Sequence, residues 1–563
     1  MLTGATRNNF HTLLDAIPLH SGAESLPAII YLSTTAEPIT VNRNNFKMHV
    51  LTHAASMAKL GIAAGDLVII AHTQSLESIY AFWGALWLGA IPSMFSTLTE
   101  KLDPDIYMRD LGELVHISGV KAILTTDHFA SRLKSKLLCP VYSSEELLLS
   151  TAPQIPHAYK SSPSDIALLQ HSSGTTGLQK GVALSHKAIL NQLASYADAL
   201  KLTSEDIIVS WLPLYHDMGL IAGFLQPLIQ GIPLVLMSPF DWVSHPAMLL
   251  RAIHDYRATL CWLPNFAYNH STRAIRQSDT ASLDLSTIRA FINCSEPVQH
   301  ESHLMFAERF AANRIRMDMF TVSYAMAENT FAVTQTKPGH YPAIDTISLD
   351  NLRQKKQAIP TESDNNSTTS IVSCGAPIPN VEVKVVDANG KTLPDRHIGE
   401  VLVRSDSMLS GYFKRPDLNP FDDQCWYRTG DQGYIAAGEI YIVGRSKDLI
   451  INAGKNIYPQ DIEAVVNTIE GIHPGRVVVF GVPDAAEGTE LIAVVAEVET
   501  TDKTAQKQIS QAIRQQVVRQ SSVTVNFVTL VNKGWLIKTS SGKIARGKNR
   551  EKWMAEKQMK QDP

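Results

Sequence analysis

The chain has 563 residues, of which 45% are hydrophobic and 18% are charged, and its formal net charge is −4. This length exceeds what one compact core holds and predicts at least two domains, while the small net charge gives no case for binding nucleic acid or an anionic membrane. The five cysteines are scattered and form no CxxC pair, so neither a disulfide framework nor a zinc site is expected, and a reduced, cytoplasmic setting fits best.

Before residue 300, short apolar strands alternate with amphipathic helical stretches. The first strand that this pattern predicts is Leu67–Ala71, and a helix is expected after it over residues 76–88. Further strands are expected at 122–125, 207–211, 232–237, 258–262 and 290–293. Such alternation predicts layered α/β domains with largely parallel sheets. Ligands of these sheets bind beyond the carboxyl ends of the strands, so the loops that follow strands are where a site is expected.

No segment is expected to cross a membrane. The start of the chain lacks a basic stretch followed by an apolar run, so no signal peptide is predicted. The longest uncharged stretch, Met218–Phe240, could span a bilayer by length alone. However, Gln226, Pro227, Gly231 and Pro233 interrupt it, which favours a helix, a turn and a buried strand.

The pattern changes in the last third of the chain. Short alternating strands at 381–386 and 401–404 indicate a β-rich subdomain, and the polar residues 353–370 predict a mobile loop. After about residue 444, helices are expected at 460–469 and 504–520, with strands at 476–480 and 491–497. The expected fold class is α/β. A large N-terminal domain of layered α/β subdomains would cover 1–445 and include the β-rich subdomain at about 375–445. A small, mobile α+β domain would cover 446–563.

A loop rich in hydroxyls and glycine lies between two apolar strands in the segment Leu168–His186. Hydroxyls, glycine backbone N–H groups and the ammonium of Lys180 are what a polyphosphate needs. Lys180-Gly181 leads into a strand rather than a helix, which excludes the P-loop pattern. On composition alone, a flexible surface loop is the alternative. The candidate phosphate-binding residues of the loop are Ser172, Ser173, Gly174, Thr175, Thr176 and Gly177.

Four more motifs follow this loop along the chain: WLPLYHDMGL at 211–220, SYAMAE at 323–328, a long segment at 427–461, and KTSSGKIAR at 538–546. Together the five resemble the adenylate-forming superfamily over roughly residues 27–550. Within it, the chain looks most like fatty acyl-AMP ligases, through WLPLYHDMGL, EPV at 296–298, VSCG at 372–375 and NIYPQD at 456–461. A segment near 344–360 looks like the insertion that marks those ligases.

The resemblance implies an enzyme that joins a fatty acid carboxylate to the α-phosphorus of ATP and releases pyrophosphate. Glu328 would coordinate Mg²⁺, a cation that prefers oxygen ligands. Tyr324 would stack on adenine, Asp431 would bind both ribose hydroxyls, and Arg445 would reach ribose or phosphate. The resemblance also assigns other residues to the nucleotide site: Ser295, Glu296, Pro297, Ala325 and Met326.

Residue type alone leaves plainer alternatives open for these side chains. Glu328 could be a surface glutamate, Tyr324 a core tyrosine, Asp431 a turn former and Arg445 a solvated arginine. The resemblance further implies that Lys447 is the hinge about which the C-terminal domain swings.

Two residues are the catalytic candidates. Lys543 follows a Ser-Ser-Gly turn, and a lysine there could bridge the attacking carboxylate and the α-phosphate in the transition state. Its alternative is a surface lysine of a basic tail. By resemblance, His216 lies between the acyl pocket and the nucleotide; its alternative is a structural histidine or helix cap. Asp217-Met218 is also a plain N-cap signal.

The acceptor of the acyl group follows only from the subfamily resemblance. Fatty acyl-AMP ligases pass the acyl group to the phosphopantetheine thiol of an acyl carrier protein, and no carrier segment follows the lysine motif, so a separate carrier protein is implied. A coenzyme A synthetase and a non-catalytic nucleotide- or acyl-binding protein on the same scaffold are the alternatives. Apolar side chains after Asp217 could line an acyl channel or belong to the core.

Overall fold

The computed structural model describes residues 10–17, 26–98, 104–149, 155–171, 180–361, 368–452, 455–484, 489–521, 523–539 and 542–558. Within these ranges no helix is long and apolar enough to cross a membrane. The five cysteines are free thiols, as the sequence predicted.

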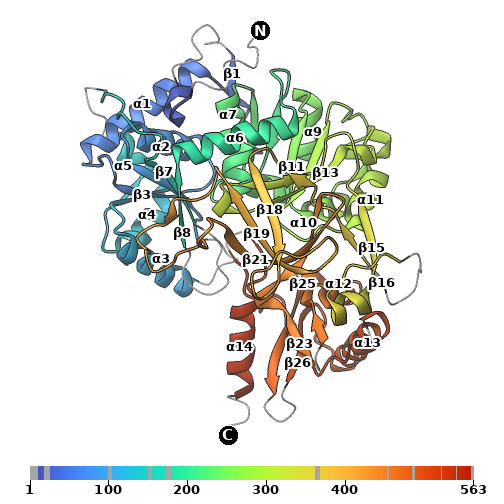
Figure 1. Ribbon diagram of the computed structural model, residues 1–563. Helices are drawn as coiled ribbons and strands as arrows, with labels where there is room; N and C mark the ends of the chain where they lie inside the picture. Colours follow the sequence, from blue (N-terminus) through green and yellow to red (C-terminus); the bar gives the residue numbers. More distant parts are fainter. Residues whose placement is uncertain are drawn as a thin grey trace.

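A nine-stranded sheet forms the middle of the molecule, in the order β17-β14-β13-β12-β11-β9-β10-β1-β2 (Figure 1). Its six central strands, from β13 to β1, are parallel, and the outer strands run antiparallel. Strands β10 and β11 in its middle are fully buried apolar runs, which is typical of a parallel sheet covered on both faces. The strands are β1 Pro27–Leu32, β2 Ile39–Asn42, β9 Ile208–Ser210, β10 Leu234–Met237, β11 Leu260–Leu263, β12 Ala290–Cys294, β13 Phe320–Ala325, β14 Ala332–Gln335 and β17 Ala376–Pro377.

Helices pack against this sheet and begin at recognisable caps. The Ser185 side chain accepts from Ala188 N at the start of α6, and Lys201 ends that helix in the left-handed region. The stretch 218–240 folds as a π-helical segment, a short helix and strand β10, as its interrupting residues predicted. The helices are α1 Arg43–Lys59, α6 His186–Leu200, η3 Met218–Leu225, α7 Gln226–Gln230, α8 Pro239–Ser244, α9 Ala247–Tyr256, α10 Asn265–Ala274 and α11 His300–Arg309.

A second, smaller parallel sheet of order β4-β3-β5-β6 lies toward the N-terminus, and a three-stranded sheet of order β20-β8-β7 accompanies it. The predicted strands 67–71 and 122–125 are present with these bounds. The strands are β3 Leu67–Ala71, β4 Ile91–Phe95, β5 Ala122–Thr125, β6 Val141–Ser143, β7 Ile166–His171, β8 Gly181–Ser185 and β20 Gly411–Tyr412. The helices are α2 Leu76–Trp87, α3 Pro104–Ser118, α4 Asp127–Lys134 and α5 Ser144–Leu149.

An antiparallel sheet of order β18-β19-β21-β22 follows the main sheet along the chain. Gly375 joins the two: its backbone lies so close to Gln335 that a Cβ would come within 2.2 Å of that backbone, and its φ is +85°. Ile440 N donates to Gly375 O, which ties this turn to β22. The strands are β18 Val381–Val386, β19 Gly399–Ser405, β21 Tyr427–Ala436 and β22 Glu439–Arg445.

The polar segment 353–370 has regular structure at both ends, where composition predicted a loop throughout. Strands β15 (Ile344–Ser348) and β16 (Thr368–Val372) pair, and a π-helical turn covers Asn351–Lys355. Arg353 is buried, with Nη1 donating to Ser521 O at 2.5 Å. Composition did not predict this regular structure, because the Arg353 side chain is paired with the C-terminal region rather than exposed to solvent. Residues 362–367 lie outside the described part of the chain.

The C-terminal part has its own sheet, β25-β26-β27, and its own buried cluster of valine and isoleucine (Figure 1, bottom). Its elements are β23 Ile450–Asn452, β24 Lys455–Ile457, α12 Pro459–Asn467, β25 Ile472–Asp484, β26 Thr489–Val498, α13 Lys503–Ser521, β27 Phe527–Asn532 and α14 Arg546–Gln558. Short 3₁₀ turns elsewhere are η2 Leu13–Ala16, η4 Gln277–Asp279, η5 Ala311–Asn313, η6 Met317–Met319, η7 Ala327–Asn329 and η9 Ser446–Asp448.

Candidate active site

Three predicted nucleotide residues lie together, although up to 121 positions separate them. Asp431 on β21 and Arg445 on β22 are cross-strand partners, with Arg445 Nε 3.0 Å from Asp431 Oδ1. The Tyr324 hydroxyl at the end of β13 donates to Asp431 Oδ2 at 2.5 Å. Burial and then Asp431 raise the pKa of Tyr324 well above its ordinary value, and Asp431 raises the pKa of Arg445. The carboxylate is therefore held between a neutral donor and a cation.

Backbone hydrogen bonds through Thr429 also hold Asp431 in place. Its backbone N–H donates to Thr429 Oγ1 at 3.0 Å, and Thr429 Oγ1 donates to Val401 O on the neighbouring strand. Asp431 is only 6% exposed. The turn-forming alternative and the ligand role are thus compatible, because the backbone makes the turn while the side chain faces Tyr324 and Arg445.

Glu328 lies in η7, immediately after β13. The Tyr412 hydroxyl donates to Glu328 Oε1 at 3.2 Å, and Lys180 Nζ stands 4.8 Å from the centre of the Tyr412 ring. Burial and then Glu328 raise the pKa of Tyr412 to about 12, so this hydroxyl stays a donor at neutral pH. Sequence reasoning missed Tyr412, because only the pairing of β20 with β8 brings it to Lys180.

Among the described residues, no group of three or more histidine, cysteine or acidic side chains could hold a metal ion. Glu328 would thus act as a single carboxylate ligand. That donor set fits Mg²⁺, which is commonly bound by one or two carboxylates together with substrate phosphates and waters.

The hydroxyl loop between β7 and β8 falls outside the part of the chain that the structure describes. Ser172, Ser173, Gly174, Thr175, Thr176 and Gly177 lie outside the described residues. The flanking elements agree with the sequence prediction: β7 ends at His171, and Lys180-Gly181 leads into strand β8, antiparallel to β7.

His216 and Asp217 form a half-buried pair between β9 and η3. His216 Nδ1 is 2.6 Å from Asp217 Oδ1, and Met218 N donates to the same oxygen at 2.7 Å, so Asp217 also caps η3. Burial acts to raise the pKa of Asp217, but the charges of His216 and Lys543 outweigh it and the pKa is lowered. Lys543 of the C-terminal part is thus close enough to act on this pair.

The turn after β12 contains Ser295, Glu296 and Pro297, which the resemblance assigned to the nucleotide site. Ser295 has φ +71°, an uncommon conformation for a non-glycine residue, and its Oγ lies 3.9 Å from Met218 Sδ. Glu296 Oε2 accepts from Phe266 N at 2.9 Å, near the start of α10. This bond fixes the Glu296 carboxylate against the start of α10, and the nucleotide roles predicted for Glu296 and Pro297 stay predictions.

Ala325 and Met326 shape the backbone after Tyr324. The register between β13 and β14 shifts between Tyr324 and Ala325, and Met326 N donates to Phe331 O. These backbone contacts bring Glu328 round toward Tyr412.

Lys543 lies half-buried in a short hairpin, whereas Lys447 is exposed. Lys543 N donates to Thr539 Oγ1 at 3.2 Å within a hairpin, and no ion pair joins Lys543 to a carboxylate in the described part of the chain. Burial raises the pKa of the Cys294 thiol to about 12, and the Lys543 charge opposes this rise. Lys447 is exposed in η9, directly after β22.

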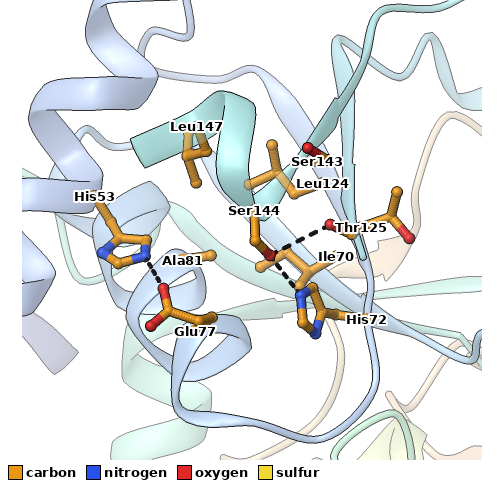
Figure 2. Close-up of a pocket in the computed structure, with 10 residues that line it drawn as sticks. All are labelled: His53, Ile70, His72, Glu77, Ala81, Leu124, Thr125, Ser143, Ser144 and Leu147. Atoms are coloured by element: carbon orange, nitrogen blue, oxygen red, sulfur yellow. Dashed lines mark hydrogen bonds and ion pairs between the residues drawn. The ribbon is translucent and has the colours of Figure 1, made fainter. Parts of the chain in front are cut away.

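A second set of polar side chains lies at the carboxyl ends of β3, β5 and β6 (Figure 2). His72 Nε2 is 2.7 Å from Ser144 Oγ, and His53 Nε2 is 2.9 Å from Glu77 Oε2. The cavity among them is also lined by Ile70, Ala81, Leu124 and Leu147, and it has room for about one water molecule.

Two family matches cover most of the chain. Residues 22–413 match the AMP-binding enzyme family, and residues 447–562 match the AMP domain of Disco-interacting protein 2-like proteins.

Similar proteins of known name span nearly the same length. The medium-chain-fatty-acid–[acyl-carrier-protein] ligase JamA of Moorena producens (strain JHB) is 33% identical over 87% of this chain and 86% of its own. The long-chain-fatty-acid–AMP ligase FadD26 of Mycobacterium marinum is 31% identical over 86% of both chains.

Solved structures agree with the fold. A chain from studies of fatty acyl-adenylate ligases of E. coli and L. pneumophila has a TM-score of 0.90 at 26% identity, covering 97% of this chain and 98% of that one. A fatty acyl-adenylate ligase from L. pneumophila in complex with acyl adenylate and pyrophosphate has a TM-score of 0.74 at 28% identity, covering 98% and 97%.

Proposed function

The chain belongs to the AMP-binding enzyme family, and we propose that it is an adenylate-forming ligase that activates a fatty acid with ATP to acyl-AMP and pyrophosphate. It would then pass the acyl group to the phosphopantetheine thiol of a separate acyl carrier protein. The observation that carries this proposal is the joining of Tyr324, Asp431 and Arg445 into one cluster. The names of JamA and FadD26, whose lengths the chain nearly spans, support the fatty acid and the carrier.

Adenylation brings two anions together, so the site must neutralise charge that builds in the transition state. Asp431 would accept from the ribose hydroxyls while Tyr324 and Arg445 hold it in place. Lys180 and the hydroxyl loop would bind the outer phosphates, and Glu328 would hold Mg²⁺ against them. The ion would screen the phosphate charges when it is bound.

Lys543 would contact the attacking carboxylate and the α-phosphate. The contribution of the Lys543 charge to the lowered pKa of Asp217 supports a position of the ammonium near the His216–Asp217 pair, where the fatty acid carboxylate would enter. His216 would orient that carboxylate through Nε2, since Nδ1 is held by Asp217. These charges act mainly in the transition state, which raises the rate rather than substrate affinity.

Transfer to the carrier would follow a swing of the C-terminal domain, residues 446–563, about Lys447. This motion would carry Lys543 away and open the acyl-AMP to a thiol. The N-terminal domain over 1–445 would keep the adenylate bound. We place the reaction in the cytoplasm, in agreement with the free thiols.

A product assay by mass spectrometry tests the function. Purified protein is given Mg²⁺-ATP and fatty acids of several chain lengths, with no acceptor, with coenzyme A, or with a holo acyl carrier protein. Acyl-AMP without acyl-CoA, and acyl transfer to the carrier, are expected. Efficient acyl-CoA formation would make the protein a coenzyme A synthetase, and no adenylate from any acid would contradict the proposal; Lys543→Ala protein serves as the control.

A further inference from the structure

The loop that carries Lys543 is a hairpin whose two sides meet at Ile537 and Ala545. Ala545 N donates to Ile537 O at 3.0 Å, and Thr539 N donates to Lys543 O at 2.7 Å nearer the tip. Gly542 has φ +85°, which allows the tight turn before the lysine. The hairpin is too short for a hydrophobic core of its own, so its position depends on what holds its base.

Asn549 holds that base from the first turns of α14. Its Oδ1 accepts from Ile537 N at 2.8 Å, and its Nδ2 donates to Ile537 O at 2.8 Å and to Ala545 O at 2.9 Å. The side chain is fully buried, with 0% exposure. One amide therefore binds both sides of the hairpin and satisfies both polar backbone groups of Ile537.

Two neighbours fix the ends of the same loop. The buried Glu497 on β26 accepts from Gly534 N at 3.0 Å and Leu536 N at 2.9 Å, ahead of the hairpin. After it, Arg546 pairs with Asp448 of η9 at 2.7 Å and with Glu463 of α12 at 2.8 Å. The hairpin is thus anchored to the segment that contains Lys447, and Asn549 is the residue of this anchorage that bonds to both sides of the hairpin.

We propose that Asn549 is a positioning residue for Lys543: its amide clamp sets the direction in which the lysine enters the active site. A flexible lysine side chain reaches one productive position only when its backbone starts from the right place, and a misplacement of about 1 Å can cost about 100-fold in rate. This inference rests on the proposed function, because it assumes that Lys543 acts in adenylation.

The two half-reactions provide the test, since Lys543 is proposed to act in the first alone. Asn549→Ala should lower kcat for acyl-AMP formation by roughly 10- to 100-fold while KM for ATP changes by less than about threefold. Transfer from purified acyl-AMP to the holo carrier should be retained. Asn526→Ala is the matched control, because Asn526 Oδ1 also binds a strand backbone, at Ile492 N, in the same part of the chain but outside the Lys543 hairpin.

A milder variant covers the case in which Asn549→Ala fails to fold. Thr539→Val removes the side-chain acceptor of Lys543 N and should lower adenylation by about 3- to 10-fold through the same misplacement. Adenylation unaffected by either variant, while Lys543→Ala is inactive, would overturn the positioning role. An equal loss of both half-reactions that parallels a lower melting temperature would also overturn the positioning role, because a purely structural residue gives that result. Adenylation that survives Lys543→Ala would instead remove the lysine from the proposed function and, with it, the reason for the clamp.

Discussion

Two parallel sheets in this chain end in polar side chains at their carboxyl edges, yet only one edge has the features of an active site. At the main sheet, Tyr324 meets Asp431 and Arg445, and Lys543 acts on Asp217 from another part of the chain. At the smaller sheet, His72 binds Ser144 and His53 binds Glu77, around a cavity with room for about one water molecule (Figure 2).

The difference lies in charge and space rather than in topology. The general rule that ligands bind beyond the strand ends applies to both sheets. At the smaller sheet the histidines are paired locally and apolar side chains close the cavity. Near the main-sheet edge, Lys180 stands beside Tyr412, which donates to Glu328, and the Lys543 charge helps to lower the pKa of Asp217. Neither lysine forms a salt bridge among the described residues. The carboxyl ends of the strands therefore predict two places for a ligand. The lysines without a salt bridge favour the main-sheet edge as the place for an anionic ligand.

The variant Lys543→Ala should have the largest effect on activity at the main-sheet edge. Loss of transition-state charge stabilisation should lower acyl-AMP formation by roughly 10²-fold or more. The measurement is pyrophosphate release with saturating ATP and fatty acid, with thermal melting as a check that the fold is intact. Turnover close to that of the unaltered protein would mean that the main-sheet edge works without this cation.

Asp431→Ala should have the next largest effect. It removes the proposed ribose acceptor and leaves the Tyr324 hydroxyl and the Arg445 guanidinium without their partner, at a cost of about 1–3 kcal/mol. ATP affinity, measured by calorimetry, should weaken accordingly. If affinity is unchanged, Asp431 serves only the turn between β21 and its neighbours.

Lys447→Pro tests whether the main-sheet site depends on domain motion. A proline in η9 should stiffen the proposed hinge and slow acyl transfer several-fold more than adenylation. Rates of the two half-reactions are measured separately, and Lys447→Ala controls for loss of the side chain. Equal slowing of both steps would count against the hinge.

Changes at the smaller sheet should affect stability and leave activity alone. Ser144→Ala removes the hydroxyl that His72 binds at 2.7 Å, which should cost about 1–3 kcal/mol of folding stability while adenylation stays within about twofold. Denaturant unfolding and the pyrophosphate assay measure the two quantities. A large loss of activity at unchanged stability would make this edge functional after all.

The smallest expected effect is a dependence of folding stability on pH, which arises from the same His72 side chain. Burial lowers the pKa of His72 below its ordinary value of about 6.5, although Thr73 O, Glu77 and Asp127 oppose the shift. Because the unfolded chain then binds more protons, stability is fully present above about pH 6.5 and is lost as pH falls below it. His72→Asn should flatten this part of the profile of melting temperature against pH; an unchanged slope would assign the dependence to other groups.

Much of the fold could be read from local pattern. The strands 67–71, 122–125 and 381–386 were predicted with the observed bounds, because buried strands are short apolar runs between turn formers. The prediction of a mobile loop over 353–370 was wrong at its two ends, where a π-helical turn and strand β16 form. Composition treats charge as exposure, whereas Arg353 is buried with Nη1 donating to Ser521 O. Tyr412 gave no local signal, because only the pairing of β20 with β8 brings it beside Lys180.

Local sequence pattern was enough for the α/β class and for several strands, because apolar periodicity is a local property of the chain. The candidate residues for adenylation came from the motifs that carry the family resemblance. Only the tertiary structure decided which of these residues meet: Tyr324 with Asp431, 107 positions apart, and Asn549 with the base of the Lys543 hairpin. Hydrogen bonds and charges act over a few ångströms in space, and the distance between two side chains in space is set by strand pairing and packing rather than by their separation along the chain.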